Sequence, residues 1–256
     1  MICDRIVYGP VSSWRLGRSL GIDMVSRAEK TCSFDCAYCQ LGPTRHHCAA
    51  RREFVALDCL LRELEQLPRV ELDYITFSGT AEPTLASNLG AAIEAVKQRL
   101  DVPVAVLTNS SLMDIPRVRR DLSQADQVVA KLDAPTEELL RRINRPVPGI
   151  TLDTILPGLH SFRSEYGGRF ALQIMFYEAN RYQAAALADL AREIDPDEVQ
   201  VNTPLRPCAV RPLPPEELGA IVEAFAGLPV LSVYDAARPD VRPLDVEATR
   251  LRRPVP

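Results

Sequence analysis

Three apolar stretches, each followed by a segment with helical periodicity, most strongly constrain how this chain can fold. They span 102–107, 127–132 and 170–176, and most of their side chains are apolar. A strand that is apolar at successive positions is buried on both faces, as in a parallel sheet covered by helices. The alternation of such runs with helical segments therefore predicts an α/β fold.

The same pattern, followed along the chain, predicts further strands and helices. Strands are expected at 72–77, 102–107, 127–132, 170–176, 198–202 and 230–233, and helices at 57–67, 86–100, 115–122, 152–163 and 183–194, and from 136 and 216 onward. Right-handed crossovers favour a barrel, and fewer than eight strand–helix pairs favour an incomplete one. We expect a partial (β/α)6-type barrel of parallel strands over 1–237, with a doubly wound open sheet as the alternative. An irregular tail rich in Pro and Arg is expected over 238–256.

Composition and charge limit where the protein works. The chain has 256 residues, 46% of them apolar, and a net charge of −4, so it has no overall electrostatic attraction to nucleic acid. No apolar run approaches the roughly 18 residues that a membrane span requires, and the N-terminus lacks the pattern of a signal peptide. We therefore expect a cytoplasmic protein without membrane contact. In that compartment cysteines are more typical of metal or catalytic sites than of disulfides.

Three of the seven cysteines form a compact group. Cys32, Cys36 and Cys39 follow the spacing C-x3-C-x2-C. Three thiolates without a nearby fourth ligand would leave one iron of a [4Fe–4S] cluster open, as a catalytic site requires. A structural zinc site is the main alternative, with His46, His47 or Cys48 as the fourth ligand. Coincidental buried thiols are the third interpretation.

This loop, with Tyr38 before its last cysteine, resembles the signature of the radical S-adenosylmethionine (SAM) superfamily. Segments 8–23, 40–42, 141–146 and 199–207 resemble a branch of Fe–S oxidoreductases related to the wyosine-tRNA synthases. The resemblance implies a radical SAM core with a [4Fe–4S] cluster and SAM as cofactors. It also implies reductive cleavage of SAM to methionine and a 5′-deoxyadenosyl radical, which abstracts hydrogen from a substrate at the barrel mouth.

Candidate cofactor contacts follow the predicted strands, where functional groups gather in barrels. Ser78, Gly79 and Glu82 resemble the family's glycine–glutamate motif, which holds the amino group of SAM. Ala81 replaces a glycine that is usual in that motif, so the loop is expected to shift slightly. Asn109 lies in a Thr-Asn turn that resembles the one beside the cofactor in the family.

Other candidates depend more on the strand assignments. Asp133 ends a strand and is expected to contact the hydroxyls or carboxylate of SAM, with a structural ion pair as the alternative. Asn202 is expected near the adenosine. Arg206 is a candidate for a substrate carboxylate or phosphate, or else an ordinary surface guanidinium. Because parallel strands end at one edge, a single cavity is expected to be surrounded by Cys36, Gly79, Glu82, Asn109, Asp133 and Asn202.

The sequence does not name the substrate. We expect a small molecule or a peptide, and a reductant such as flavodoxin or ferredoxin as partner. A tRNA-modifying enzyme of the wyosine type is the alternative, although the acidic charge weighs against it. A non-catalytic zinc or Fe–S binding module is the other alternative. No acid–base pair or catalytic nucleophile is apparent.

Overall fold

An eight-stranded sheet forms the centre of the computed structural model, which describes residues 5–26 and 29–254. The strands lie in the order β1 (Val7–Ser13), β2 (Gly17–Ile22), β5 (Tyr74–Phe77), β6 (Val104–Thr108), β7 (Gln127–Lys131), β8 (Arg169–Met175), β9 (Glu198–Asn202) and β10 (Val230–Ser232). All neighbouring pairs from β2 to β10 are parallel, and β1 adds an antiparallel edge. The predicted partial barrel of parallel strands is confirmed.

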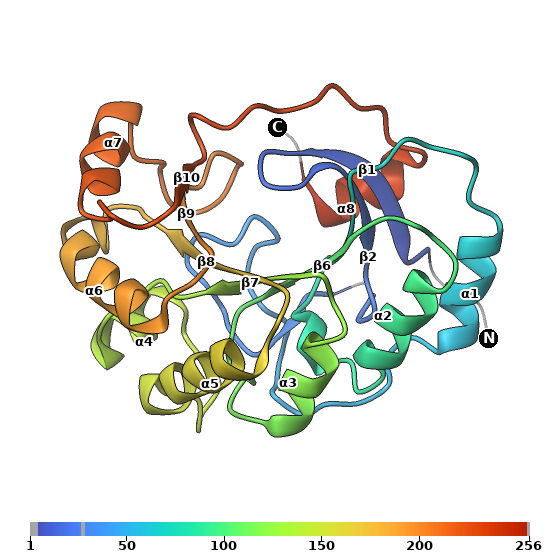
Figure 1. Cartoon of the computed structure of the whole chain (residues 1–256), viewed down its shortest axis with the longest axis horizontal. Coiled ribbons are helices and arrows are strands. Elements are labelled where there is room, and N and C mark those ends of the chain that lie inside the picture. The colour runs from blue at the N-terminus through green and yellow to red at the C-terminus, as the bar shows by residue number, and fades with distance from the viewer. Residues whose placement is uncertain (1–4, 27–28, 255–256) are drawn as a thin grey trace.

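Helices cover the outer side of the curved sheet (Figure 1). They are α1 (Leu57–Glu65), α2 (Leu89–Lys97), α3 (Pro116–Leu122), α4 (Glu137–Ile143), α5 (Leu152–Glu165), α6 (Ala184–Ile194) and α7 (Pro215–Glu223), with short 3-10 turns η1 (Pro83–Leu85) and η2 (Arg181–Gln183). Among the described residues, no helix is long and apolar enough to cross a membrane. The helix expected at 86–100 is observed as α2, from Leu89 to Lys97, and it follows the short turn η1, where Glu82 accepts a bond from the Thr84 amide.

The hairpin of β1 and β2 carries no strand prediction, because glycines and polar residues interrupt its apolar pattern. The two strands pair because Gly21 in β2 lets the ring of Tyr8 in β1 come close, which sequence periodicity does not show. A Cβ atom on Gly21 would lie 2.0 Å from the ring of Tyr8 in the neighbouring strand. The hairpin therefore joins the parallel sheet through β2, which pairs with β5.

The C-terminal segment is more ordered than expected. Residues Val246–Arg252 form helix α8, which is capped by Asp245 and lies against β1. The amide of Gly9 donates to Thr249 Oγ1 at 3.0 Å, and the amide of Leu244 donates to the carbonyl of Gly9 at 2.6 Å. The expectation of an irregular tail is therefore wrong for 246–252, because long-range contacts with β1 stabilise a short helix there.

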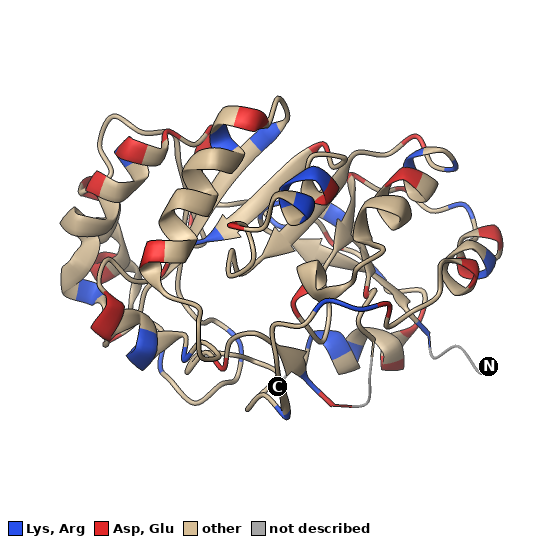
Figure 2. Cartoon of the chain, turned by 90° about the horizontal axis from the view of Figure 1, so that it is seen from below, with Lys and Arg blue, Asp and Glu red and all other residues tan. Residues whose placement is uncertain are grey.

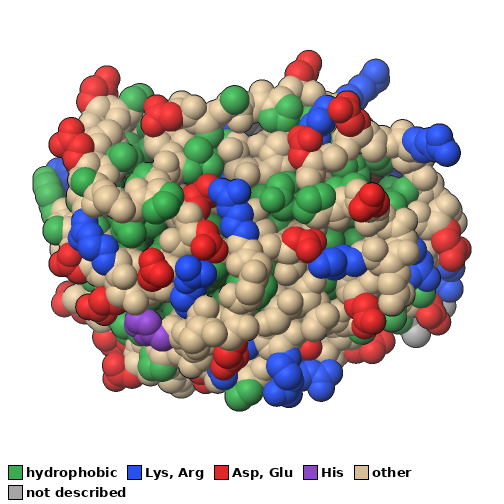
Figure 3. Space-filling view, in the orientation of Figure 1, with side chains coloured by type: hydrophobic (Ala, Val, Ile, Leu, Met, Phe, Trp, Pro, Cys, Tyr) green, Lys and Arg blue, Asp and Glu red, His purple; other side chains and the backbone are tan. Residues whose placement is uncertain are grey.

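The inner face of the sheet is more polar than the apolar runs suggest. Alternating positions place Thr76, Lys131, Gln173 and Asn202 toward cavities, while their neighbours pack into the core. On the outside, acidic and basic side chains are interspersed over the helices, as Figures 2 and 3 show. The polar inner face, rather than the outer surface, is the place where a binding site is expected.

Candidate active site

A cavity of about 210 Å³ lies beside the cysteine loop at the carboxyl edge of the sheet. Its lining includes all three predicted cluster ligands and most predicted cofactor contacts: Cys32, Tyr38, Cys36, Cys39, Ser78, Gly79, Glu82 and Asn109. These residues come from the cysteine loop and from the segments that follow β5 and β6. Glu82 and Asn109 thus lie at the same end of the sheet as Cys36, as the strand assignments predict.

Backbone hydrogen bonds fasten the cysteine loop to the segment after α4. The amide of Asp35 donates to the Asn144 carbonyl at 2.9 Å, and that of Ala37 donates to the Ile143 carbonyl at 2.9 Å. In the other direction, the Val147 amide donates to Ser33 at 2.9 Å. The segment 141–146, to which the sequence assigns no role, therefore includes residues that hold the cysteine loop in place.

Amide groups donate to two of the three predicted ligand sulfurs. Cys32 Sγ lies 3.4 Å from the Phe34 amide nitrogen and 3.5 Å from Asn109 Nδ2, and Cys36 Sγ lies 3.4 Å from Asn144 Nδ2. Such donors stabilise thiolate ligands and tune Fe–S clusters. Burial raises the pKa of Cys32 well above its usual value and that of Cys36 to about 11, so ligation needs a compensating positive charge. Three sulfurs beside one cavity, two of them with amide donors, fit the ligand set of a [4Fe–4S] cluster.

The two histidines among the alternative zinc ligands have other partners. His46 pairs with Glu29 at 3.1 Å, and His47 Nε2 lies 3.1 Å from the Ser33 carbonyl oxygen. Across 5–26 and 29–254, no three His, Cys, Asp or Glu side chains are grouped as ligands of one metal ion. Cys48 and Cys208 are free thiols, whereas Cys59 in α1 is disulfide-bonded. The expectation that the cysteines are thiols or metal ligands and not disulfides fails at Cys59.

The carboxylate of Glu82 organises the ends of β5 and β6. Its Oε1 accepts from the Thr84 amide at 3.1 Å and from the hydroxyls of Thr84 and Thr108 at 2.7 Å each, and its Oε2 accepts from the Asn109 amide at 2.7 Å. Burial raises the pKa of Glu82, although these donors oppose the shift. Since Oε2 accepts only one of these bonds, it keeps capacity for another donor, such as an ammonium group.

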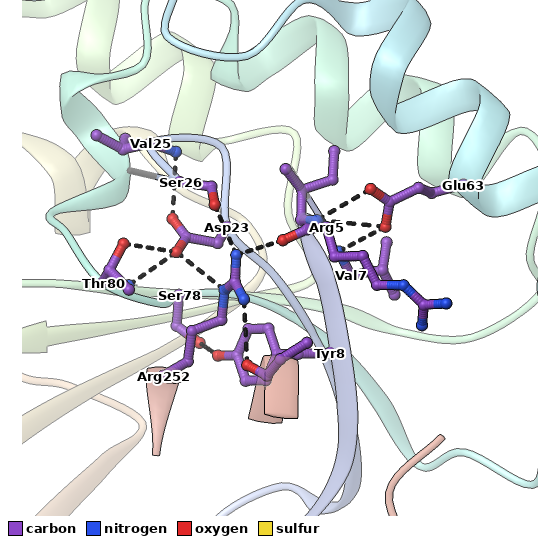
Figure 4. Close-up of polar contacts among 12 residues, drawn as sticks. Arg5, Val7, Tyr8, Asp23, Val25, Ser26, Glu63, Ser78, Thr80 and Arg252 are labelled. Atoms are coloured by element: carbon purple, nitrogen blue, oxygen red, sulfur yellow. Dashed lines mark hydrogen bonds and ion pairs between the residues drawn. The ribbon is translucent and has the colours of Figure 1, made fainter. Parts of the chain in front are cut away.

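A buried ion pair supports the loop that contains Gly79 (Figure 4). Asp23 Oδ2 accepts from the amide of Thr80 at 2.9 Å, from its hydroxyl at 2.8 Å, and from Arg252 Nε at 3.1 Å. A Cβ atom on Gly79 would lie 2.3 Å from the carboxyl carbon of Asp23, so only glycine fits there. Helix α8 thereby supports the loop through Asp23 and Arg252, neither of which the sequence singles out.

Two predicted residues lie outside the lining of this cavity. Asp133 accepts from the Tyr38 hydroxyl, from Asn144 Nδ2 at 2.8 Å and from the Met175 amide at 2.8 Å, so it positions Tyr38 instead of lining the cavity. Asn202 lines a neighbouring cavity, and its Oδ1 accepts from the Thr203 amide at 2.9 Å. The single-cavity expectation therefore fails for Asp133 and Asn202, because strand ends alone do not determine how deep a side chain lies. Contact of any of these residues with SAM stays a prediction.

Comparisons with known proteins agree with this arrangement. The family model of the radical SAM superfamily matches residues 30–191. A UPF0026 protein from Synechocystis sp. is 45% identical over 207 residues, which cover 78% of this chain and 76% of the relative. A UPF0026 protein from Methanocaldococcus jannaschii is 36% identical over 228 residues, which cover 86% of this chain and 70% of the relative.

Among solved structures, Streptococcus suis SuiB superposes with a TM-score of 0.64 at 16% identity. The match covers 85% of this chain and 49% of SuiB, so the chain spans about half the length of that protein. A likeness at this level of identity concerns the fold alone.

Proposed function

Because the chain belongs to the radical SAM superfamily, we propose that it is an enzyme that uses a [4Fe–4S] cluster to cleave SAM reductively. The observation that carries the proposal is the shared cavity of Cys32, Cys36 and Cys39 with Glu82 and Asn109. When bound, the cluster and SAM supply a 5′-deoxyadenosyl radical that abstracts hydrogen from a substrate.

The chain's own residues have distinct tasks in this proposal. The three cysteines ligate the cluster, and Asn109 and Asn144 donate to two of the sulfurs. Glu82 Oε2 accepts from the amino group of SAM, beside the backbone of Ser78 and Gly79. The cavity lies between the cysteine loop and the segments that follow β5 and β6, so a bound cofactor would lie beside all three cysteines.

For the substrate we propose a small molecule or a peptide. The net charge of −4 and the interspersed surface charges support this choice over a tRNA. The UPF0026 names state no substrate, so the wyosine-type resemblance gains no support from these relatives. As electron donor we propose a one-electron reductant such as flavodoxin or ferredoxin.

Anaerobic reconstitution tests the cluster. The wild-type protein is expected to bind about four iron and four sulfide per chain. Cys36→Ala is expected to lose most of the iron, whereas the matched variants Cys48→Ala and Cys208→Ala are expected to keep it. Full iron content in Cys36→Ala would contradict the ligand assignment. If the wild-type protein binds zinc and no iron, and Cys48→Ala loses that zinc, the protein is a zinc module.

SAM cleavage tests the activity separately. Reduced wild-type enzyme is expected to release 5′-deoxyadenosine and methionine slowly without substrate, as chromatography would show. Glu82→Ala is expected to weaken SAM binding by about 1–3 kcal/mol, as for the loss of a charge-assisted hydrogen bond. Unchanged SAM affinity in Glu82→Ala would remove this residue from the cofactor site.

A further inference from the structure

A second cavity, of about 310 Å³, adjoins the first. It lies between the β1–β2 hairpin on one side and the ends of β8, β9 and β10 on the other. Tyr38, Cys39 and Lys131 line both cavities, so a ligand in the second cavity would lie beside the cysteine loop. Its volume is near the lower end of the range for small-molecule sites, which starts at roughly 300 Å³.

The charged residues that line this cavity all have the same sign. They are Arg15, Lys131, Arg206, Arg238 and Arg253. Among the described residues, no Asp or Glu lines it. The cationic lining contrasts with the whole chain, in which acidic residues outnumber basic ones. The positive charge is therefore a local property of this cavity.

These cations are poorly compensated within the described part of the chain. The guanidinium of Arg15 forms no hydrogen bond or ion pair there; it lies 5.0 Å from the centre of the Trp14 ring, and its Nε is buried without a partner. The ammonium of Lys131 is also buried without a hydrogen bond, 3.6 Å from Asp133. Arg206 donates at 2.6 Å to the neutral side chain of Gln40. Two half-buried cationic side chains thus keep buried nitrogen atoms without hydrogen-bond partners beside this cavity.

Burial makes these charges costly. It lowers the pKa of Arg15 to about 10, and the positive charge of Arg253 adds to that shift. Burial likewise lowers the pKa of Arg253. Charges that are removed from water without a partner destabilise the folded state unless a ligand of opposite sign neutralises them. An anion in this cavity would relieve the repulsion between Arg15 and Arg253 and satisfy the buried donors.

We propose that this cavity binds a phosphate group of a small-molecule substrate through Arg15, Arg206 and Arg253. The inference rests on the proposed function, since it assigns the second cavity to the substrate of the same site. Guanidinium groups match phosphate oxygens with paired donors, and several cations suit a dianion better than a single carboxylate. The limited volume favours a small molecule over an RNA strand.

Titration calorimetry with inorganic phosphate tests the proposal on anaerobically reconstituted protein at constant ionic strength. Wild-type protein is expected to bind about one phosphate per chain with an affinity at least about tenfold above that for acetate. Arg15→Met and Arg253→Met are each expected to weaken phosphate binding by about tenfold or more. Arg250→Met, which removes an exposed arginine from α8, is expected to leave it unchanged.

The outcomes separate this proposal from the proposed function. Iron content and substrate-free SAM cleavage are measured in parallel on the wild type, because both properties depend on the cluster and SAM residues. If the wild-type protein neither binds iron nor cleaves SAM, the proposed function is refuted, and the phosphate measurement is not affected. The phosphate proposal is overturned by no measurable binding, by equal binding in Arg253→Met, or by tighter binding of tRNA that these variants do not change.

Discussion

The two cavities differ in whether the charged side chains beside them have partners within the described chain. Beside the cysteine loop, Glu82 accepts four hydrogen bonds and Asp23 accepts from Thr80 and Arg252. In the neighbouring cavity, Arg15 and Arg253 face no carboxylate among the described residues. The buried carboxylates of the first region are hydrogen-bonded within the chain, whereas the second region has arginines without an acidic partner among the described residues.

This difference separates structural support from ligand recognition. Buried polar groups that are fully hydrogen-bonded hold segments in one arrangement, as Asp23 does between α8 and the loop of Gly79. Buried donors without partners cost folding free energy and are retained where a ligand completes them. The two cavities can therefore be told apart by whether the charged residues beside them have oppositely charged or hydrogen-bonding partners within the described chain.

The largest expected effect compares two adjacent arginines. Arg252→Met removes the partner of Asp23, whose side chain is 3% exposed, and is expected to lower the free energy of unfolding by about 3–5 kcal/mol. Arg253→Met removes an unpaired cation and is expected to leave stability unchanged or slightly raised. Urea denaturation measures the free energy of unfolding of both variants. Similar losses of stability in the two variants would contradict the distinction between paired and unpaired charges.

A smaller effect is expected at Gly79. Gly79→Ala forces a Cβ atom against the Asp23 carboxyl group and is expected to cost about 1–3 kcal/mol, as for overpacking. It should also weaken SAM binding, because the loop beside Glu82 must move. Gly219→Ala in α7 is the control, since no atom lies within 4 Å of its added Cβ and helix propensity favours alanine. A neutral Gly79→Ala, measured by thermal denaturation and SAM titration, would show that Asp23 does not constrain the loop.

The smallest effect concerns the pH dependence of Glu82. Its folded-state pKa is raised, mainly by burial, so the folded state keeps this proton longer than the unfolded state. The contribution of Glu82 to stability therefore falls as pH rises from the ordinary glutamate range through the raised pKa. The Thr108 hydroxyl opposes the shift, so Thr108→Val is expected to cost up to about 1 kcal/mol above that pKa and less below it.

Urea denaturation across this pH range would measure the difference between wild type and Thr108→Val, which cancels the titration of other carboxyl groups. The same comparison in a Glu82→Gln background is the control, and its pH dependence is expected to vanish. A pH-dependent difference that persists without Glu82 would assign the effect to another group.

Periodicity and spacing predict much of this protein. The parallel sheet follows from runs such as 127–132, because a strand buried on both faces must be apolar at nearly every position. The positions of Glu82 and Asn109 follow from the same strands, since parallel strand ends share one edge. The C-x3-C-x2-C loop with Tyr38 already indicated the superfamily that the family model identifies.

Contacts between distant segments were decided only by the tertiary structure. The side chain of Asn144 donates to Cys36 Sγ, 108 positions away, and Asp133 accepts from the Tyr38 hydroxyl although it also follows a strand. Arg252 and Arg253 show the limit most clearly, because they are identical and adjacent in sequence. Arg252 meets Asp23, 229 positions away, and becomes a structural ion pair, whereas Arg253 lines a cavity without an acid. A charge's free energy depends on which groups the fold brings within a few ångströms, and local sequence does not contain that information.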